Sequence, residues 1–252
     1  MTAISQGRTR RRAALAGALC ALLVTGAGLT GCSSEEDPDA GTNGVGKLSP
    51  DKIQSRTRAA AKSVATVRLA GTVVGKDGTY TLDMRLSDNG GTGSVSSKNG
   101  TFHLLKVGEQ LYLKADAAYW SHGGEADGKG SEAATGKLEG KYVKVPAGDP
   151  AYQRFSGFTD KNALLDGLLT LHGTLATDGR HQQDGVRTIR ITGDKGAGGT
   201  LDVSLEGTPF PLRLVRAGNA GTLRLADWGK DVALKEPSKD ETVDYGQQLP
   251  SS

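Results

Sequence analysis

The sequence predicts an α+β domain, in which one antiparallel sheet of roughly nine to eleven strands packs against helices from residues 49–66 and 150–171. Two observations lead to this fold class. Apolar and polar residues alternate with a period of two in two separate groups of short segments, and a segment with helical spacing precedes each group. Glycine is abundant, with 37 residues, whereas aromatic residues make up only 5%, which favours short strands joined by glycine turns.

The first helix is predicted to begin at Ser49-Pro50-Asp51. Serine is a favourable N-cap, proline suits the first helical position, and an acidic residue stabilises the positive end of a helix. Small and apolar residues then recur at helical spacing, at Ile53, Thr57, Ala60, Ala61 and Val64. This small apolar side predicts close packing on a sheet.

The first group of strands is predicted over residues 67–114. Segments 67–73 and 80–86 alternate in polarity, and the turn Lys76-Asp77-Gly78 between them is a strong hairpin signal. Segment 92–97 is mostly polar, which is typical of an edge or solvent-covered strand. Segments 102–107 and 111–114 form a further predicted hairpin, so the first half of the chain reads as an antiparallel meander.

The middle of the chain mixes element types. We expect a short helical turn at 115–120, a short strand at 142–145, and a long polar loop at 123–137 of the kind that is usually functional or disordered. Asp149-Pro150 and Thr159-Asp160 are predicted helix starts.

The last third of the chain returns to period-two alternation. Strands are predicted at 186–192, 199–206, 212–217 and 221–228, separated by glycine or proline turns. One face of each is expected to be buried and the other wet.

The N-terminus carries an export pattern. A positively charged stretch is formed by Arg8, Arg10, Arg11 and Arg12, and a small-residue and leucine run follows over 13–29. The run ends at Leu29-Thr30-Gly31-Cys32, which resembles the lipobox of a bacterial lipoprotein signal peptide. That resemblance implies a diacylglyceryl group on the sulfur of Cys32, acylated as with palmitate, and cleavage just before it. An ordinary secretory peptide with a chance cysteine is the alternative, and the arginines leave Sec or twin-arginine export open.

This organisation predicts four parts: a signal peptide at 1–31, the lipidated Cys32 with a flexible tether at 32–47, a domain at 48–236 and a polar tail at 237–252. We therefore expect the protein on the outer face of the cytoplasmic membrane, held by two acyl chains. Loss of residues 1–31, with their four arginines, leaves 27 basic against 28 acidic residues, a net charge of −1. This balance argues against nucleic acid as a partner.

Three short stretches carry a family resemblance. They are 108–114 running into Tyr119-Trp120, Pro211-Leu212-Arg213, and 223–229. With the order of elements, they resemble LolA-like lipoprotein-carrier domains and, among these, the actinobacterial LppX/LprG-type lipoproteins. The resemblance implies a strongly curved antiparallel sheet (a half-barrel) with helices covering its concave face, and an apolar cavity between them that holds lipid acyl chains.

If such a cavity exists, its walls are predicted to be one face of the first meander and the inner face of the second helical region. The predicted pocket residues are Tyr80, Leu82, Met84, Phe102, Leu104, Phe155, Phe158, Leu165 and Leu168. A filled core of a protein–protein interaction module in the envelope carries the same residues, so this alternative stays open. The chain has no Gly-x-Ser-x-Gly, His-Glu-x-x-His or phosphate-loop motif. We therefore predict no catalytic residue, metal or cofactor, and a monomer.

Overall fold

The structure is a computed structural model that describes residues 39–75, 78–122, 138 and 140–244. The signal peptide, Cys32, the start of the tether, the loop at 123–137 and the end of the tail lie outside the described residues. The helices are α1 (Pro50–Lys62), α2 (Ala117–His122), α4 (Pro150–Ser156) and α5 (Lys161–Leu168), with 3-10 turns η1 (Val45–Lys47), η2 (Asp194–Gly196), η3 (Ala217–Asn219) and η4 (Lys239–Glu241).

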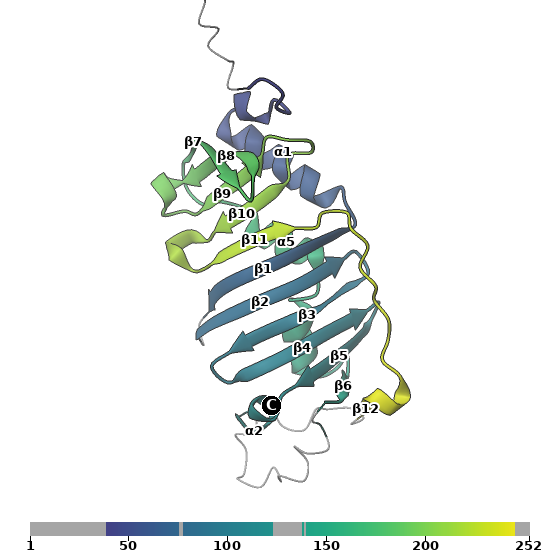
Figure 1. Ribbon diagram of the computed structural model, residues 1–252. Coiled ribbons are helices and arrows are strands. Elements are labelled where there is room, and N and C mark those ends of the chain that lie inside the picture. The colour runs from purple at the N-terminus through teal and green to yellow at the C-terminus, as the bar shows by residue number, and fades with distance from the viewer. Residues whose placement is uncertain (1–38, 76–77, 123–137, 139, 245–252) are drawn as a thin grey trace, which may run out of the picture. The chain divides into compact units, whose positions relative to one another are not determined.

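The strands form one sheet. They are β1 (Thr66–Gly75), β2 (Gly78–Ser87), β3 (Gly90–Ser97), β4 (Gly100–Val107), β5 (Gln110–Ala115), β6 (Tyr142–Val145), β7 (Leu175–Gln183), β8 (Val186–Gly193), β9 (Thr200–Ser204), β10 (Pro211–Val215), β11 (Thr222–Ala226) and β12 (Thr242–Asp244). Their spatial order is β12-β6-β5-β4-β3-β2-β1-β11-β10-β9-β8-β7 (Figure 1). Because β1 pairs with both β2 and β11, the two meanders join into a single sheet.

The predicted fold class is confirmed. The sheet is curved and does not close, and the helices lie against one face of it (Figure 1). Every neighbouring pair of strands is antiparallel except β12 and β6, which are parallel. The sheet therefore has twelve strands rather than nine to eleven, and it is mixed by this one pair.

Two strands were not predicted. β7 has nine residues with polar side chains on both faces, and none of them is fully buried, so it lacks the alternation that marks a strand. β12 lies in the segment that we expected to be a polar tail, where a capping box at Ser238 and Glu241 precedes it. The expected tail therefore begins with ordered structure that adds an edge strand to the sheet.

The polar strand β3 is interior rather than an edge, since it lies between β2 and β4. Its helix-facing positions include Gly91 and Gly93, and small residues there let other groups approach. A Cβ at Gly91 would lie 2.7 Å from Leu86 Cδ2 and 3.3 Å from the Thr159 carbonyl oxygen. Glycine thus replaces apolar side chains on this strand so that the chain between α4 and α5 can come close to the sheet.

The expected tether is shorter than predicted. From Asp39 onward the chain is bound to the domain: the Asn43 amide donates to the Leu205 carbonyl at 2.8 Å, and the Asn43 side chain donates to the Ser204 carbonyl at 2.9 Å. Val45 in η1 is only 1% exposed. Residues 39–47 therefore belong to the domain, because polar side chains in this segment hold its backbone to β9 and Val45 enters the core.

The predicted helix starts are confirmed. Pro50 occupies the first turn of α1, and the carboxylates of Asp149 and Asp160 accept hydrogen bonds from Ala151 and Ala163 at the starts of α4 and α5. The apolar sides of these helices enter one core cluster with the sheet, through residues that include Ile53, Phe155, Leu165 and Leu169.

Candidate functional site

The nine predicted pocket residues lie together. All of them belong to one apolar cluster between the sheet and the helices: Leu82, Met84, Phe102, Leu104, Phe155 and Leu165 are buried, and Tyr80, Phe158 and Leu168 are partly buried against it. We call this group, with the buried apolar side chains of β1–β6 around it, the interlayer cluster.

Strand register explains why the sheet residues of the cluster meet. Leu82 on β2 is paired with Val95 on β3, which is paired with Phe102 on β4. In the next row Met84 opposes Gly93, and Gly93 opposes Leu104. Side chains two residues apart share a face of a strand, so these two rows form adjacent bands on the helix-facing side.

Aromatic rings form one side of the interlayer cluster. The Phe102 ring centroid lies 5.2 Å from that of Tyr119 and 5.3 Å from that of Phe155, which are distances typical of favourable aromatic pairs. Burial raises the pKa of the Tyr119 phenol, and the Arg154 guanidinium opposes this shift. Nε1 of Trp120 is buried and, within the described part of the chain, donates to no acceptor. The aromatic side therefore holds one unsatisfied hydrogen-bond donor.

The interlayer cluster is tightly packed. Met84 is 0% exposed, Leu104 and Leu165 are 1% exposed, and Phe102 is 5% exposed. Four surface hollows, with volumes of about 220, 80, 110 and 310 Å³, lie elsewhere, and of the nine predicted residues only Leu168 lines any of these four. Their linings contain charged and polar side chains, so none of the four is an acyl-chain cavity of the predicted kind.

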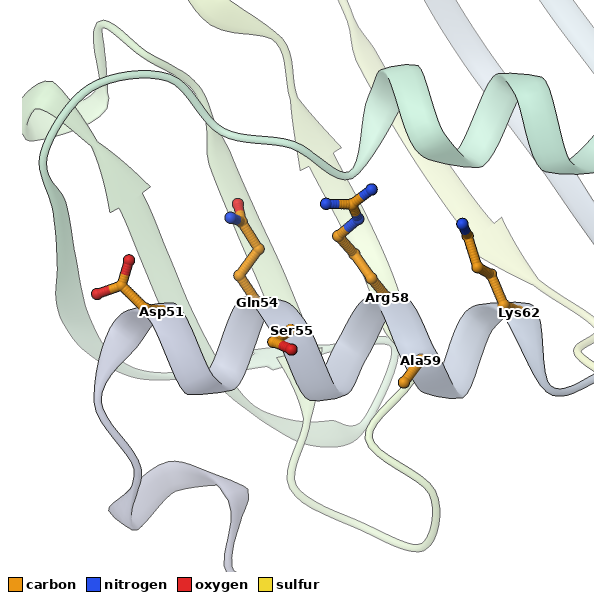
Figure 2. Close-up of a pocket in the computed structure, with 6 residues that line it drawn as sticks. All are labelled: Asp51, Gln54, Ser55, Arg58, Ala59 and Lys62. Atoms are coloured by element: carbon orange, nitrogen blue, oxygen red, sulfur yellow. The ribbon is translucent and has the colours of Figure 1, made fainter.

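One of these hollows, of about 220 Å³, follows the surface of α1 and was not predicted. Figure 2 shows Asp51, Gln54, Arg58 and Lys62 projecting from the same side of the helix. Arg58 Nη2 and Lys62 Nζ lie 3.0 and 2.7 Å from the same carboxylate oxygen, Oδ1 of Asp166 on α5. Hydrogen bonds lower the pKa of Asp166, and the one from Lys62 has a larger effect than the one from Arg58. The spacing of these four α1 residues, three or four positions apart, could have indicated a polar stripe on the helix. Only the fold shows that α5 supplies the Asp166 carboxylate to it.

The described residues contain no group of three or more His, Cys, Asp or Glu side chains placed to hold a metal ion. Within the same residues, no helix is long and apolar enough to cross a membrane. Cys32, the predicted lipidation residue, lies outside the described residues.

No protein-family model matches the chain, and no curated protein matches it by sequence. Among solved structures it is similar to LprF from Mycobacterium bovis, with 16% identity and a TM-score of 0.49, over 76% of this chain and 100% of that one. It is also similar to the lipoprotein LppX from Mycobacterium tuberculosis, with 17% identity and a TM-score of 0.44, over 74% and 100%. A putative outer membrane lipoprotein-sorting protein domain from Vibrio parahaemolyticus has 9% identity and a TM-score of 0.23, over 75% and 95%.

The curved sheet with helices on one face, which the sequence resemblance implied, is observed in this structure. These likenesses are distant, and they concern the fold alone.

Proposed function

We propose that this protein is a lipid-anchored lipoprotein of the bacterial cell envelope that binds or carries acyl lipids between its sheet and its helices. The observation that carries this proposal is the rim of the interlayer cluster. Several large apolar side chains there are only partly buried yet pack against the buried core: Tyr80, Tyr119, Trp120, Phe158, Leu164 and Leu168. Partly exposed apolar side chains thus adjoin the buried core at these positions, and an acyl chain that enters between the sheet and the helices would contact them first.

The unsatisfied donor on Trp120 supports the same proposal. A buried N–H without an acceptor costs about 1–3 kcal/mol, and an ester or carboxylate oxygen of a lipid would satisfy it. The function is binding, and it uses no reacting group. A monomer suffices for it.

The anchor is the other half of the proposal. Cys32 carries the lipid after cleavage of residues 1–31, and the domain then works on the outer face of the cytoplasmic membrane. The Cys32→Ala variant should leave the detergent phase when cell extracts are partitioned, and it should lose acyl label. Unchanged partitioning with unchanged label would show that the chain is held by something else.

A second candidate function is an envelope protein–protein interaction module with a filled core. The low exposure of Met84, Leu104 and Leu165 favours it, because these side chains already fill the space between the layers. Opening that space for a ligand would need helices α4 and α5 to move away from the sheet.

Native mass spectrometry of the purified protein separates these two functions. An acyl lipid bound in the interlayer would appear as added mass beyond that of the anchor on Cys32. The carrier function would be ruled out if the measured mass equalled that of the protein plus its anchor and the protein bound no fluorescent fatty acid.

Substitutions that introduce a charge distinguish the two functions further. We expect Leu168→Asp, at the partly buried rim, to lose fatty-acid binding while the domain still melts cooperatively, because a rim carboxylate can stay hydrated. Val74→Asp is the matched control, since Val74 is 44% exposed and lies outside the interlayer cluster. Leu104→Asp places the same charge at a 1% exposed site, where a filled core would lose the fold. Unfolding of both interlayer variants, with no binding by the wild type, would support the interaction module.

A further inference from the structure

The chain between the predicted lipid anchor and the domain is short. Asp39 forms an ion pair with Arg180 on β7 at 2.5 Å, and the Arg187 guanidinium donates to the carbonyls of Ala40 and Gly41. Cys32 lies seven residues before Asp39. At most about 3.5 Å per residue, that span reaches roughly 25 Å. A lipid on Cys32 would therefore hold the η1 and β7–β9 end of the domain close to the membrane surface.

Helix α1 begins next to this attachment and exposes a basic face. Its thirteen residues contain four basic side chains and one acidic side chain. Lys52, Arg56 and Lys62 are exposed, and they lie on the side away from the buried Ile53, Thr57 and Ala61. Within the described residues, neither Lys52 nor Arg56 forms an ion pair. This excess of positive charge stands out in a mature chain whose net charge is −1.

The hollow in Figure 2 flanks the same face. Arg58 and Lys62 share the single carboxylate of Asp166, so two positive charges meet one negative charge at its wall. These three side chains are 36%, 46% and 44% exposed. An additional anion can therefore approach both cations from the solvent side, and a space of about 220 Å³ is open beside them.

We propose that the exposed basic face of α1 docks on anionic phospholipid headgroups of the membrane that anchors the chain, with Lys52 and Arg56 as the principal contacts. This inference rests on the proposed anchor at Cys32. The tether keeps α1 within a short distance of the bilayer, which gives the headgroups a high effective concentration. Weak electrostatic contacts then suffice to orient the domain, and Arg58 and Lys62 place a headgroup phosphate beside the hollow.

The test uses the full lipidated protein in vesicles of phosphatidylcholine alone and of phosphatidylcholine mixed with phosphatidylglycerol. Cys32 is the single cysteine of the mature chain, and in the lipidated protein its thiol carries the lipid. A cysteine introduced by Ser55→Cys on α1 is therefore the only thiol that an environment-sensitive label can modify. Asn99→Cys in the β3–β4 turn serves as the comparison site. We expect a blue shift at residue 55 only with phosphatidylglycerol, and loss of the shift when salt rises from roughly 0.1 M to 1 M, because the Debye length falls from about 10 to 3 Å.

Removal of the basic contacts gives the decisive result. Each basic residue near an anionic surface strengthens binding by roughly fivefold. The double variant Lys52→Gln with Arg56→Gln should therefore lower the docked-to-undocked ratio by about 30-fold. Lys98→Gln with Lys239→Gln makes the same change of net charge at exposed sites outside α1 and should leave the ratio unchanged. Equal losses in the two double variants would overturn docking through α1.

The anchor is checked in the same samples by detergent-phase partitioning. A protein that is retained in the detergent phase but gives no shift at residue 55 overturns the docking proposal and leaves the anchor intact. A wild-type protein that fails to partition overturns both proposals, because docking depends on the tether.

Discussion

Two arginine–aspartate pairs on the sheet have similar contact geometry and different surroundings. Arg68 contacts both carboxylate oxygens of Asp83 at 2.8 and 2.7 Å, and the two side chains are 37% and 43% exposed. Arg190 contacts both carboxylate oxygens of Asp202 at 2.6 and 3.1 Å, but these side chains are 19% and 0% exposed. The contact geometry of an ion pair therefore does not set its contribution to stability, because solvent weakens the first pair and is excluded from the second.

The difference comes from how the two halves of the sheet fold. Asp202 alternates with Leu201 and Val203 of the core, so it lies on the face opposite to the helices. On that face an ion pair joins Asp184, in the β7–β8 turn, to Arg224 on β11. The hairpin therefore reaches past β9 and β10 on that face. Asp202 itself is contacted by Arg190 and Arg213 and is 0% exposed. In the first half, neighbouring strands follow each other by short turns, and the outer face stays open around Asp83.

The largest effect is expected for Asp202→Ala. It leaves Arg190, which is 19% exposed, with only the more distant carboxylate of Asp178 at 3.9 Å. Arg213, whose Nη1 lies 3.7 Å from Asp202, loses the same partner. Breaking a buried pair in this way costs about 3–5 kcal/mol. Urea unfolding followed by circular dichroism measures the loss, with Asp83→Ala as the matched control. Similar losses for the two variants would show that burial does not separate the pairs.

A second buried ion provides an intermediate case. Lys161 at the start of α5 is 1% exposed, and its Nζ lies 2.6 Å from Asp88 and donates to the Val64 carbonyl. Its partner Asp88 is 57% exposed, so only one member of the pair is buried.

For Lys161→Met we expect a loss of about 1–3 kcal/mol, because methionine keeps much of the apolar stem but leaves the Val64 carbonyl unpaired. Thermal unfolding checks it, with Lys62→Met on exposed α1 as the control. A loss no larger than that of the control would show that the ammonium contacts contribute little.

Much of this arrangement could be predicted from the sequence. Alternation and glycine turns located ten strands, and they placed Leu82, Met84, Phe102 and Leu104 on one face, because side-chain direction follows residue parity. β12 escaped prediction because its three residues are paired with β6, about a hundred positions earlier, and no local pattern encodes such a contact.

The spacing between helices and sheet could not be predicted in the same way. The same apolar residues can line a cavity or fill a core. Which of the two they form depends on the distance between helices and sheet, and that distance is small where glycine takes the place of a larger residue. Gly91 and Gly93 leave room for Thr159 and Met84 to approach β3. This closeness is a property of packed surfaces and leaves no periodic signal. The Asp166 contacts of Arg58 and Lys62 were missed for a related reason, since they join segments more than a hundred residues apart.

A smaller effect is expected for the exposed pair. Asp83→Ala should destabilise the protein by less than about 1 kcal/mol, because both partners remain largely solvated whether or not they meet. A double-mutant cycle with Arg68→Ala isolates the coupling between the two side chains. A coupling as large as that between Arg190 and Asp202 would contradict the role that we assign to solvent exclusion.

The smallest effect is the pH dependence of the same pair. The hydrogen bond from Arg68 lowers the pKa of Asp83 below its ordinary value of 3.8, against the opposing effect of burial. The folded state therefore binds this proton less readily than the unfolded state does, so the pair stabilises the fold above about pH 4. As pH falls below 3.8 and through the folded-state pKa, that contribution is lost. The stability difference between wild type and Asp83→Asn should be greatest near neutral pH and should shrink toward about pH 2. Urea unfolding of both proteins across this range measures it. A difference that grows as the pH falls would mean that Asp83 is protonated more easily in the folded state, and the assignment of Arg68 as its stabilising partner would be wrong.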